Sequence, residues 1–114
     1  MNRILLAFII LLPIACGKRD RLENTPAGIL PMDSMALFLR DIHDLESALL
    51  VSGIRQDSLQ NLYRELEPGI FQKHHSDTAK VNRSLRYYTS DPELLDSLYH
   101  RVLHFTDSTA EYKP

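Results

Sequence analysis

Hydrophobic and polar positions repeat with the period of an α-helix along most of the chain after residue 32. The first apolar stripe recurs at steps of three and four residues, which predicts an amphipathic helix. Asp33 or Ser34 can cap the start of this helix, and Gly53 can end it. The stripe consists of Met35, Phe38, Ile42, Leu45 and Leu49.

A second stripe predicts another helix that begins at Asp57, with Gln60 in the position of a capping box. Proline inside a helix removes a hydrogen bond and clashes with the preceding turn. We therefore predict a kink or break at Pro68–Gly69, with residues 70–75 resuming as a short helical turn. The stripe consists of Leu59, Leu62, Tyr63 and Leu66.

Two further helices are predicted in the second half of the chain. Ser76 or Asp77 can cap the first, and Ser90 or Asp91 can cap the second, which has Pro92 at its first position. The stripe of the first is Val81, Leu85 and Tyr88, and we expect Tyr88 to be buried; the stripe of the second is Leu94, Leu95, Leu98, Val102 and Phe105.

No segment keeps the two-residue alternation of a strand, so the predicted fold class is all-α. We expect a small bundle of four to five helices over residues 33–106, with a frayed tail at residues 107–114. The length of 114 residues allows one domain.

Residues 1–15 have a different pattern, because they are apolar almost throughout. Arg3 supplies a positive charge, and residues 4–12 form an apolar run of the length that secretory signals use. A membrane-spanning helix needs roughly 20 apolar residues, and Pro13 and Lys18 end this run sooner. We therefore expect residues 1–15 to be a signal peptide.

Cys16 is the only cysteine of the chain and stands at the end of this apolar run. Its setting after Ala15 resembles a bacterial lipobox, whose cysteine is diacylated and becomes the mature N-terminus. Pro13 stands where that pattern usually has Leu, and the alternative is a plain secretory signal cut after Ala15. We expect lipidation of Cys16, followed by a flexible tether that extends to residue 32, because glycine and proline recur there.

The net charge of −2 excludes the clustered basic excess that nucleic-acid-binding proteins show. Histidines are the candidates for metal chemistry. His100 and His104 lie four residues apart on one helix face, a spacing that can hold a metal, but no third ligand accompanies them. His74, His75 and Asp77 form a second, loose cluster. We favour solvated side chains at both places, so no metal and no cofactor is predicted.

His43 follows Ile42 on the first predicted helix, with carboxylates close to it in sequence. A histidine bonded to a carboxylate is a plausible general base, yet no nucleophile in a recognisable setting accompanies it, so we predict no enzyme. His43 is then a packing residue or faces a partner. Arg86 and Tyr87 are further candidates for partner binding, because both residue types are enriched in binding hot spots. In the alternative, Tyr87 packs on a neighbouring helix and Arg86 pairs with an acid.

The second half of the chain resembles a family of small lipoproteins of Gram-negative bacteria, catalogued as domain of unknown function forty-two ninety-six. Residues 70–74 and 84–88 carry the family's two longer motifs, and residues 41–43 resemble the centre of its first helix. Single matching positions are Pro92, Tyr99 and Val102. The chain departs from the family at Val81, where an aromatic residue is usual, and at Pro68–Gly69.

This resemblance implies an all-helical periplasmic lipoprotein and no established activity. We expect a lipoprotein of the cell envelope that faces the periplasm and is held in a lipid bilayer by acylated Cys16, with the outer membrane slightly favoured because residue 17 is Gly. The expected role is a non-catalytic protein-interaction or assembly module for an unidentified envelope protein. The alternative is a chaperone-like binder of unfolded envelope proteins, which a continuous apolar groove would favour over a compact patch around Arg86 and Tyr87.

Overall fold

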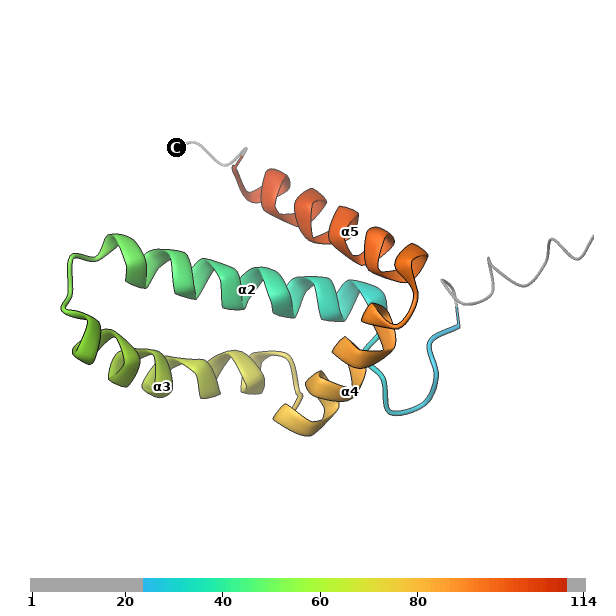
Figure 1. The fold of residues 1–114 in the computed structure, drawn as a ribbon, viewed down its shortest axis with the longest axis horizontal. Coiled ribbons are helices and arrows are strands. Elements are labelled where there is room, and N and C mark those ends of the chain that lie inside the picture. The colour runs from blue at the N-terminus through green and yellow to red at the C-terminus, as the bar shows by residue number, and fades with distance from the viewer. Residues whose placement is uncertain (1–23, 111–114) are drawn as a thin grey trace, which may run out of the picture.

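Residues 24–110 of the chain are described by a computed structural model. They form four α-helices and no strand, which confirms the all-α class. The helices, labelled as in Figure 1, are α2 (Met32–Val51), α3 (Gln56–Lys73), α4 (Thr78–Thr89) and α5 (Pro92–Ala110). None of these helices is long and apolar enough to cross a membrane. The expected signal peptide and Cys16 lie outside the described residues.

The longest helix, α2, lies between two others. Figure 1 shows α5 along one side of α2 and α3 along the other, with α4 at the end where α2 and α5 begin. Helix α4 packs mainly against α5. Helices α3 and α5 are therefore placed by α2, and α4 is placed mainly by α5.

The hydrophobic core lies where the first halves of α2 and α5 meet α4. Its buried members are Leu30, Met32, Met35, Ala36, Phe38, Val81, Tyr88, Leu94 and Leu98. Helix α3 contributes no fully buried residue. The core is thus concentrated at one end of the molecule, and the second half of α2 is covered less completely.

Helix α4 holds the segment that precedes α2 through the backbone of Leu30. The amide N–H of Leu30 donates to Oγ of Ser84 at 2.8 Å, and the hydroxyl of Tyr88 donates to the carbonyl of Leu30 at 2.7 Å. Both bonds are buried, and buried backbone groups need such partners. The tether predicted to extend to residue 32 therefore ends earlier, because Leu30 already belongs to the core.

The burial of Tyr88 is confirmed, since only 1% of it is exposed, but the face of α4 that was predicted around it is partly wrong. Leu85 is 40% exposed, whereas its neighbour Ser84 is fully buried. The buried positions are Val81, Ser84 and Tyr88, still three and four residues apart. Ser84 takes the inward position because its hydroxyl satisfies the amide of Leu30.

On α5 the predicted stripe also divides. Leu94 and Leu98 are buried, but Leu95 is 42% exposed. Helix α5 continues to Ala110, so the frayed tail predicted from residue 107 is still helical there. The C-terminal end of the domain is longer than the periodicity indicated.

Two of the predicted helix starts are confirmed by their bonds. Oδ1 of Asp77 accepts from the amide of Lys80 at 2.8 Å, and Oδ1 of Asp91 accepts from the amide of Glu93 at 2.9 Å, one residue beyond Pro92. Each side chain satisfies an amide that the first turn leaves without a partner.

The starts of α2 and α3 differ from the prediction. Pro31 and Arg55 occupy the cap positions, without a side-chain cap bond. Asp33 and Asp57 fall inside the first turns instead, where negative charge favours the helix dipole.

Helix α3 continues through Pro68, so of the kink or break predicted there the break does not occur. Pro68 is exposed, and so is Arg64, whose carbonyl loses its usual donor, so water can reach that carbonyl. Beyond the proline, Phe71 packs on Phe38 of α2 with ring centroids 5.1 Å apart. This packing holds the last turns in one helix, and the separate turn predicted at residues 70–75 does not form.

Candidate functional site

A groove of about 380 Å³ lies between α2 and α5. Each helix lines it with four residues at the spacing i, i+3, i+4 and i+7, which places them on one face of two helical turns. The lining residues are Leu39, Ile42, His43 and Glu46 of α2 and Tyr99, Val102, Leu103 and Thr106 of α5. Most of this lining is apolar, so the groove presents hydrophobic surface to solvent.

The residues of α5 that line the groove belong in part to a stripe of exposed apolar side chains. Leu95, Tyr99 and Leu103 lie four residues apart and are 42%, 64% and 46% exposed. Val102, on the inner side of the same helix, packs against the core. Helix α5 therefore has one continuous apolar face, which is core on one side and open on the other. Contiguous exposed apolar patches mark interaction sites in soluble proteins.

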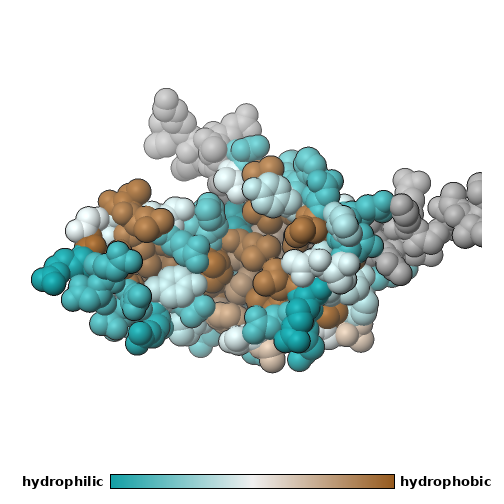
Figure 2. All heavy atoms as spheres, viewed as in Figure 1, coloured by the Kyte–Doolittle hydropathy of each residue, from teal (hydrophilic) through white to brown (hydrophobic). Residues whose placement is uncertain are grey.

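Apolar surface continues along α2 to the turn before α3. Leu50, Val51 and Ile54 are all exposed there. Figure 2 shows brown apolar atoms gathered at this end of the molecule and again over its middle. The exposed apolar surface thus extends beyond the groove.

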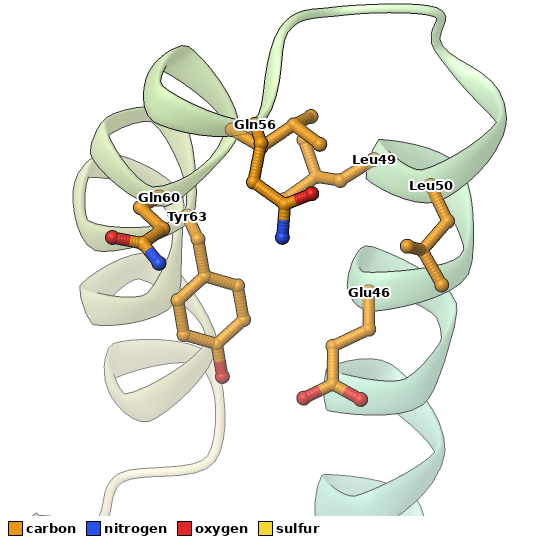
Figure 3. A pocket seen from close by; sticks show the side chains of 7 residues that line it. Glu46, Leu49, Leu50, Gln56, Gln60 and Tyr63 are labelled. Atoms are coloured by element: carbon orange, nitrogen blue, oxygen red, sulfur yellow. The ribbon is translucent and has the colours of Figure 1, made fainter.

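A second pocket, of about 280 Å³, opens between the distal part of α2 and the first turns of α3. Figure 3 shows Glu46 of α2 and Tyr63 of α3 on facing sides of it. Burial, together with the negative charges of Glu67 and Glu46, raises the pKa of Tyr63. Glu46 lines both this pocket and the α2/α5 groove, so its carboxylate lies between two mostly apolar cavities.

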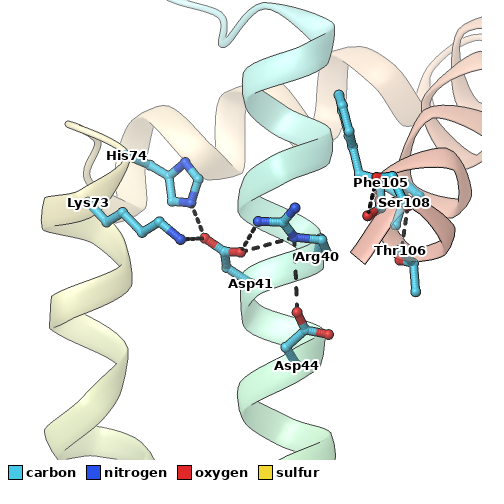
Figure 4. Close-up of polar contacts among 9 residues, drawn as sticks. Arg40, Asp41, Asp44, Lys73, His74, Phe105, Thr106 and Ser108 are labelled. Carbon is cyan, nitrogen blue, oxygen red and sulfur yellow. Dashed lines mark hydrogen bonds and ion pairs between the residues drawn. The ribbon is translucent and has the colours of Figure 1, made fainter. Parts of the chain in front are cut away.

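A polar cluster joins α2 to the last turn of α3 (Figure 4). Asp41 accepts hydrogen bonds from Nζ of Lys73 at 2.6 Å and Nη2 of Arg40 at 2.7 Å, and Nε2 of His74 lies 2.7 Å from Oδ2. The side chains of Asp41 and His74 are only 10% and 11% exposed. The ring of His74 also meets Phe38 edge-on, with centroids 5.6 Å apart.

Burial alone would raise the pKa of Asp41, but the hydrogen bonds from Lys73, Arg40 and His74 outweigh it and lower the pKa to about 2. Asp41 is therefore a carboxylate near neutral pH and can only accept, so Nε2 of His74 carries the hydrogen between them. In the part of the chain that the structure describes, no side chain hydrogen-bonds to the other ring nitrogen of His74. The arrangement holds the end of α3 against α2.

The three residues predicted to bind a partner lie on two helices. His43 is exposed and lines the α2/α5 groove. The carboxylate of Asp41, two residues before it in sequence, bonds to His74 instead. Arg86 is exposed on α4, while Tyr87 is half-buried and meets Tyr88 edge-on at 5.2 Å. Neither Arg86 nor Tyr87 lines the groove.

His100 and His104 stay on one face of α5 and line the same shallow hollow, whereas His74 has a partner on another helix. His74 is held by Asp41, and His100 lies 3.6 Å from Asp96, with both side chains largely exposed. Within residues 24–110, no group of three or more His, Cys, Asp or Glu side chains is placed to hold a metal ion.

The sequence matches the family described as Domain of unknown function (DUF4296) over residues 26–110. The matched region includes all four helices, the groove and the Asp41 cluster. No curated protein and no solved structure matches the chain.

Proposed function

The chain belongs to the DUF4296 family, and from this premise we propose that it is a lipid-anchored envelope protein whose helical domain binds a partner protein without catalysing a reaction. The observation that carries the proposal is the exposed apolar surface around the α2/α5 groove. Leu95, Tyr99 and Leu103 stay open to solvent directly beside a packed core. Fully burying an exposed side chain of this size contributes about 1.5–3 kcal/mol. These side chains are only about half exposed, so a partner that covers the stripe gains part of that energy from each.

An apolar groove was the feature expected to favour the chaperone-like alternative, but the α2/α5 groove is short, and its length favours a specific partner instead. Lining residues from i to i+7 span about 10 Å along each helix, at roughly 1.5 Å per residue. An extended chain, at about 3.3 Å per residue, would place only about three residues in that length. A helix presents two full turns over the same distance, which matches the two turns on each wall.

The N-terminal pattern supports the envelope part of the proposal. Diacylated Cys16 would anchor the domain stably, because a second acyl chain removes the reversibility of a single one. A chain between Cys16 and Leu30 reaches roughly 45 Å at most, at about 3.3 Å per residue. The partner is then a periplasmic or membrane protein that the groove, farther along α2 than Leu30, can reach from the bilayer, with the outer membrane favoured slightly.

Site-specific photo-crosslinking in cells tests this proposal. A crosslinking amino acid replaces Leu103 in the groove wall or, as a control, Leu85 on α4, which is exposed to a similar degree (46% and 40%). We expect a discrete envelope-protein adduct from position 103 and none of that mass from position 85. Equal adducts from both positions, or none from position 103, would contradict the proposal, and a broad smear of many proteins from position 103 would favour the chaperone.

A further inference from the structure

The charges around the α2/α5 groove indicate which kind of partner segment it accepts. Building on the proposed function, we propose that the groove binds an amphipathic helix of the partner that carries Lys or Arg beside its apolar stripe. Neither the family description nor the exposed stripe alone identifies such a ligand.

The shape of the groove suits a helix. Figure 1 shows α5 leaning away from α2 toward its C-terminal end, and the groove lies between these two diverging helices. Each wall offers apolar side chains at helical spacing, and a third helix can set its own stripe between such rows. Helix-in-groove binding of this kind uses anchors at i, i+3, i+4 and i+7.

Acidic side chains border the groove on both sides. Glu46 lines the α2 wall, and no Lys or Arg is among the described lining residues. On α5, Asp96 precedes Tyr99 by three residues and Asp107 follows Leu103 by four, so both exposed acids flank the apolar stripe. Basic groups on an incoming helix would meet opposite charges, whereas acidic groups would be repelled.

The same acids disfavour the other occupants of such a surface. A second copy that laid its α5 into the groove would bring its own Asp96 and Asp107 toward Glu46. Anionic lipid headgroups would meet the same repulsion, because membrane surfaces attract basic segments. Charge complementarity therefore selects a basic amphipathic helix from another protein.

Matched synthetic peptides test the proposal on the full mature chain in phosphatidylcholine nanodiscs. The probes are two stapled helices with the same leucine stripe, flanked by Lys in one and by Glu in the other. Fluorescence anisotropy at low ionic strength gives the affinity of each. We expect the Lys peptide to bind at least about tenfold more tightly than the Glu peptide, and added salt to narrow the difference because it screens exposed charges.

Variants show whether the groove is responsible. Glu46→Lys should shrink the preference for the Lys peptide severalfold, whereas Glu65→Lys on the exposed face of α3 makes the same charge change away from the groove and should have a smaller effect. Leu103→Asp should weaken both peptides about tenfold or more, and Leu85→Asp should leave both affinities unchanged. Equal binding of the two peptides, or equal effects of the two lysine variants, would overturn the inference.

Failure of this inference is distinguishable from failure of the proposed function. If neither peptide binds while the in-cell crosslink from position 103 persists, the partner segment is not a basic helix and partner binding still stands. A crosslink from position 103 to a second copy of the chain, or binding to anionic nanodiscs that Leu103→Asp abolishes, would assign the groove to those occupants and overturn the inference.

Discussion

The two buried hydrogen bonds to Leu30 make a sharp prediction about stability. Ser84→Ala leaves the amide of Leu30 without its acceptor, and Tyr88→Phe leaves the carbonyl without its donor. A buried polar group that loses its partner destabilises a protein by about 1–3 kcal/mol. Each substitution should therefore lower the free energy of unfolding by that amount, from a total of roughly 5–10 kcal/mol for a domain of this size.

The two losses should not add. Once either bond is gone, the segment around Leu30 can move away from α4, and water then reaches the remaining polar group. We expect the double variant Ser84→Ala/Tyr88→Phe to lose about 1 kcal/mol less free energy of unfolding than the sum of the two single losses, because both bonds hold the same residue.

The assay is a urea titration of the single and double variants, followed by circular dichroism. Thr89→Ala is the matched control, since its hydroxyl donates to the carbonyl of Leu85 at 2.8 Å on the exposed side of the same helix. It should change stability by less than about 0.5 kcal/mol. Full additivity, or a Ser84→Ala effect no larger than that of Thr89→Ala, would refute the view that α4 locks Leu30 into the core.

Three further predictions concern other parts of the chain. The pKa of folded Asp41, about 2, lies below its ordinary value of 3.8. The ionised side chain therefore stabilises the fold fully above about pH 4, and this contribution is lost as the pH falls toward 2. Asp41→Asn should lower the free energy of unfolding by about 2 kcal/mol at pH 7 and flatten this acid dependence in urea titrations at several pH values. Cys16→Ser should release the chain from membranes in fractionated cells or leave an unprocessed precursor, and a wild-type protein with a free Cys16 thiol by mass spectrometry would exclude lipidation. Tyr88→Ala should destabilise the domain by about 3–5 kcal/mol in the same titrations, and Tyr87→Ala, at a half-buried position, by much less; the reverse order would contradict the phase assigned to α4.

Helix positions could be predicted from the sequence because their signals are local. The apolar stripes repeat at three and four residues, and the caps at Asp77 and Asp91 act on amides within three residues of themselves. The inward position of Ser84 was not accessible in this way. Its partner Leu30 lies 54 residues away, and hydropathy alone favours the neighbouring Leu85 for a buried site.

The Asp41 cluster was missed for a related reason. Periodicity shows which residues share a face of α2 or of α3, but it does not set how far one helix slides along the other. That register decides that His74, and not the nearby His43, reaches Asp41. The signal that was available is weaker: the turn between α2 and α3 is short, so the end of α3 had to return toward the first half of α2.

The groove had a signal that was interpreted too simply. The predicted stripe of α5 contained both Leu94 and Leu95, and a face that also includes Tyr99 and Leu103 is wider than one neighbouring helix can cover. Binary patterning treats every apolar residue as core, whereas the structure buries Leu94 and leaves Leu95 exposed. When the apolar face of a helix is wider than one neighbouring helix can cover, the extra apolar residues indicate a binding surface.

The position of the core gives this surface its proposed use. Leu30 is bonded at the end of the domain where α2 begins, so a lipid tether would enter there, and α2 extends about 30 Å from that end at roughly 1.5 Å per residue. The groove and the exposed Leu50 lie along this length, away from the point of attachment. Helix α3 has no fully buried residue. Apolar surface on the distal half of α2 therefore stays exposed beside α3 as well as beside α5. In the proposed function, the lipid tether would hold the domain at its core end, and the exposed apolar surface farther along α2 would be free to receive the partner helix.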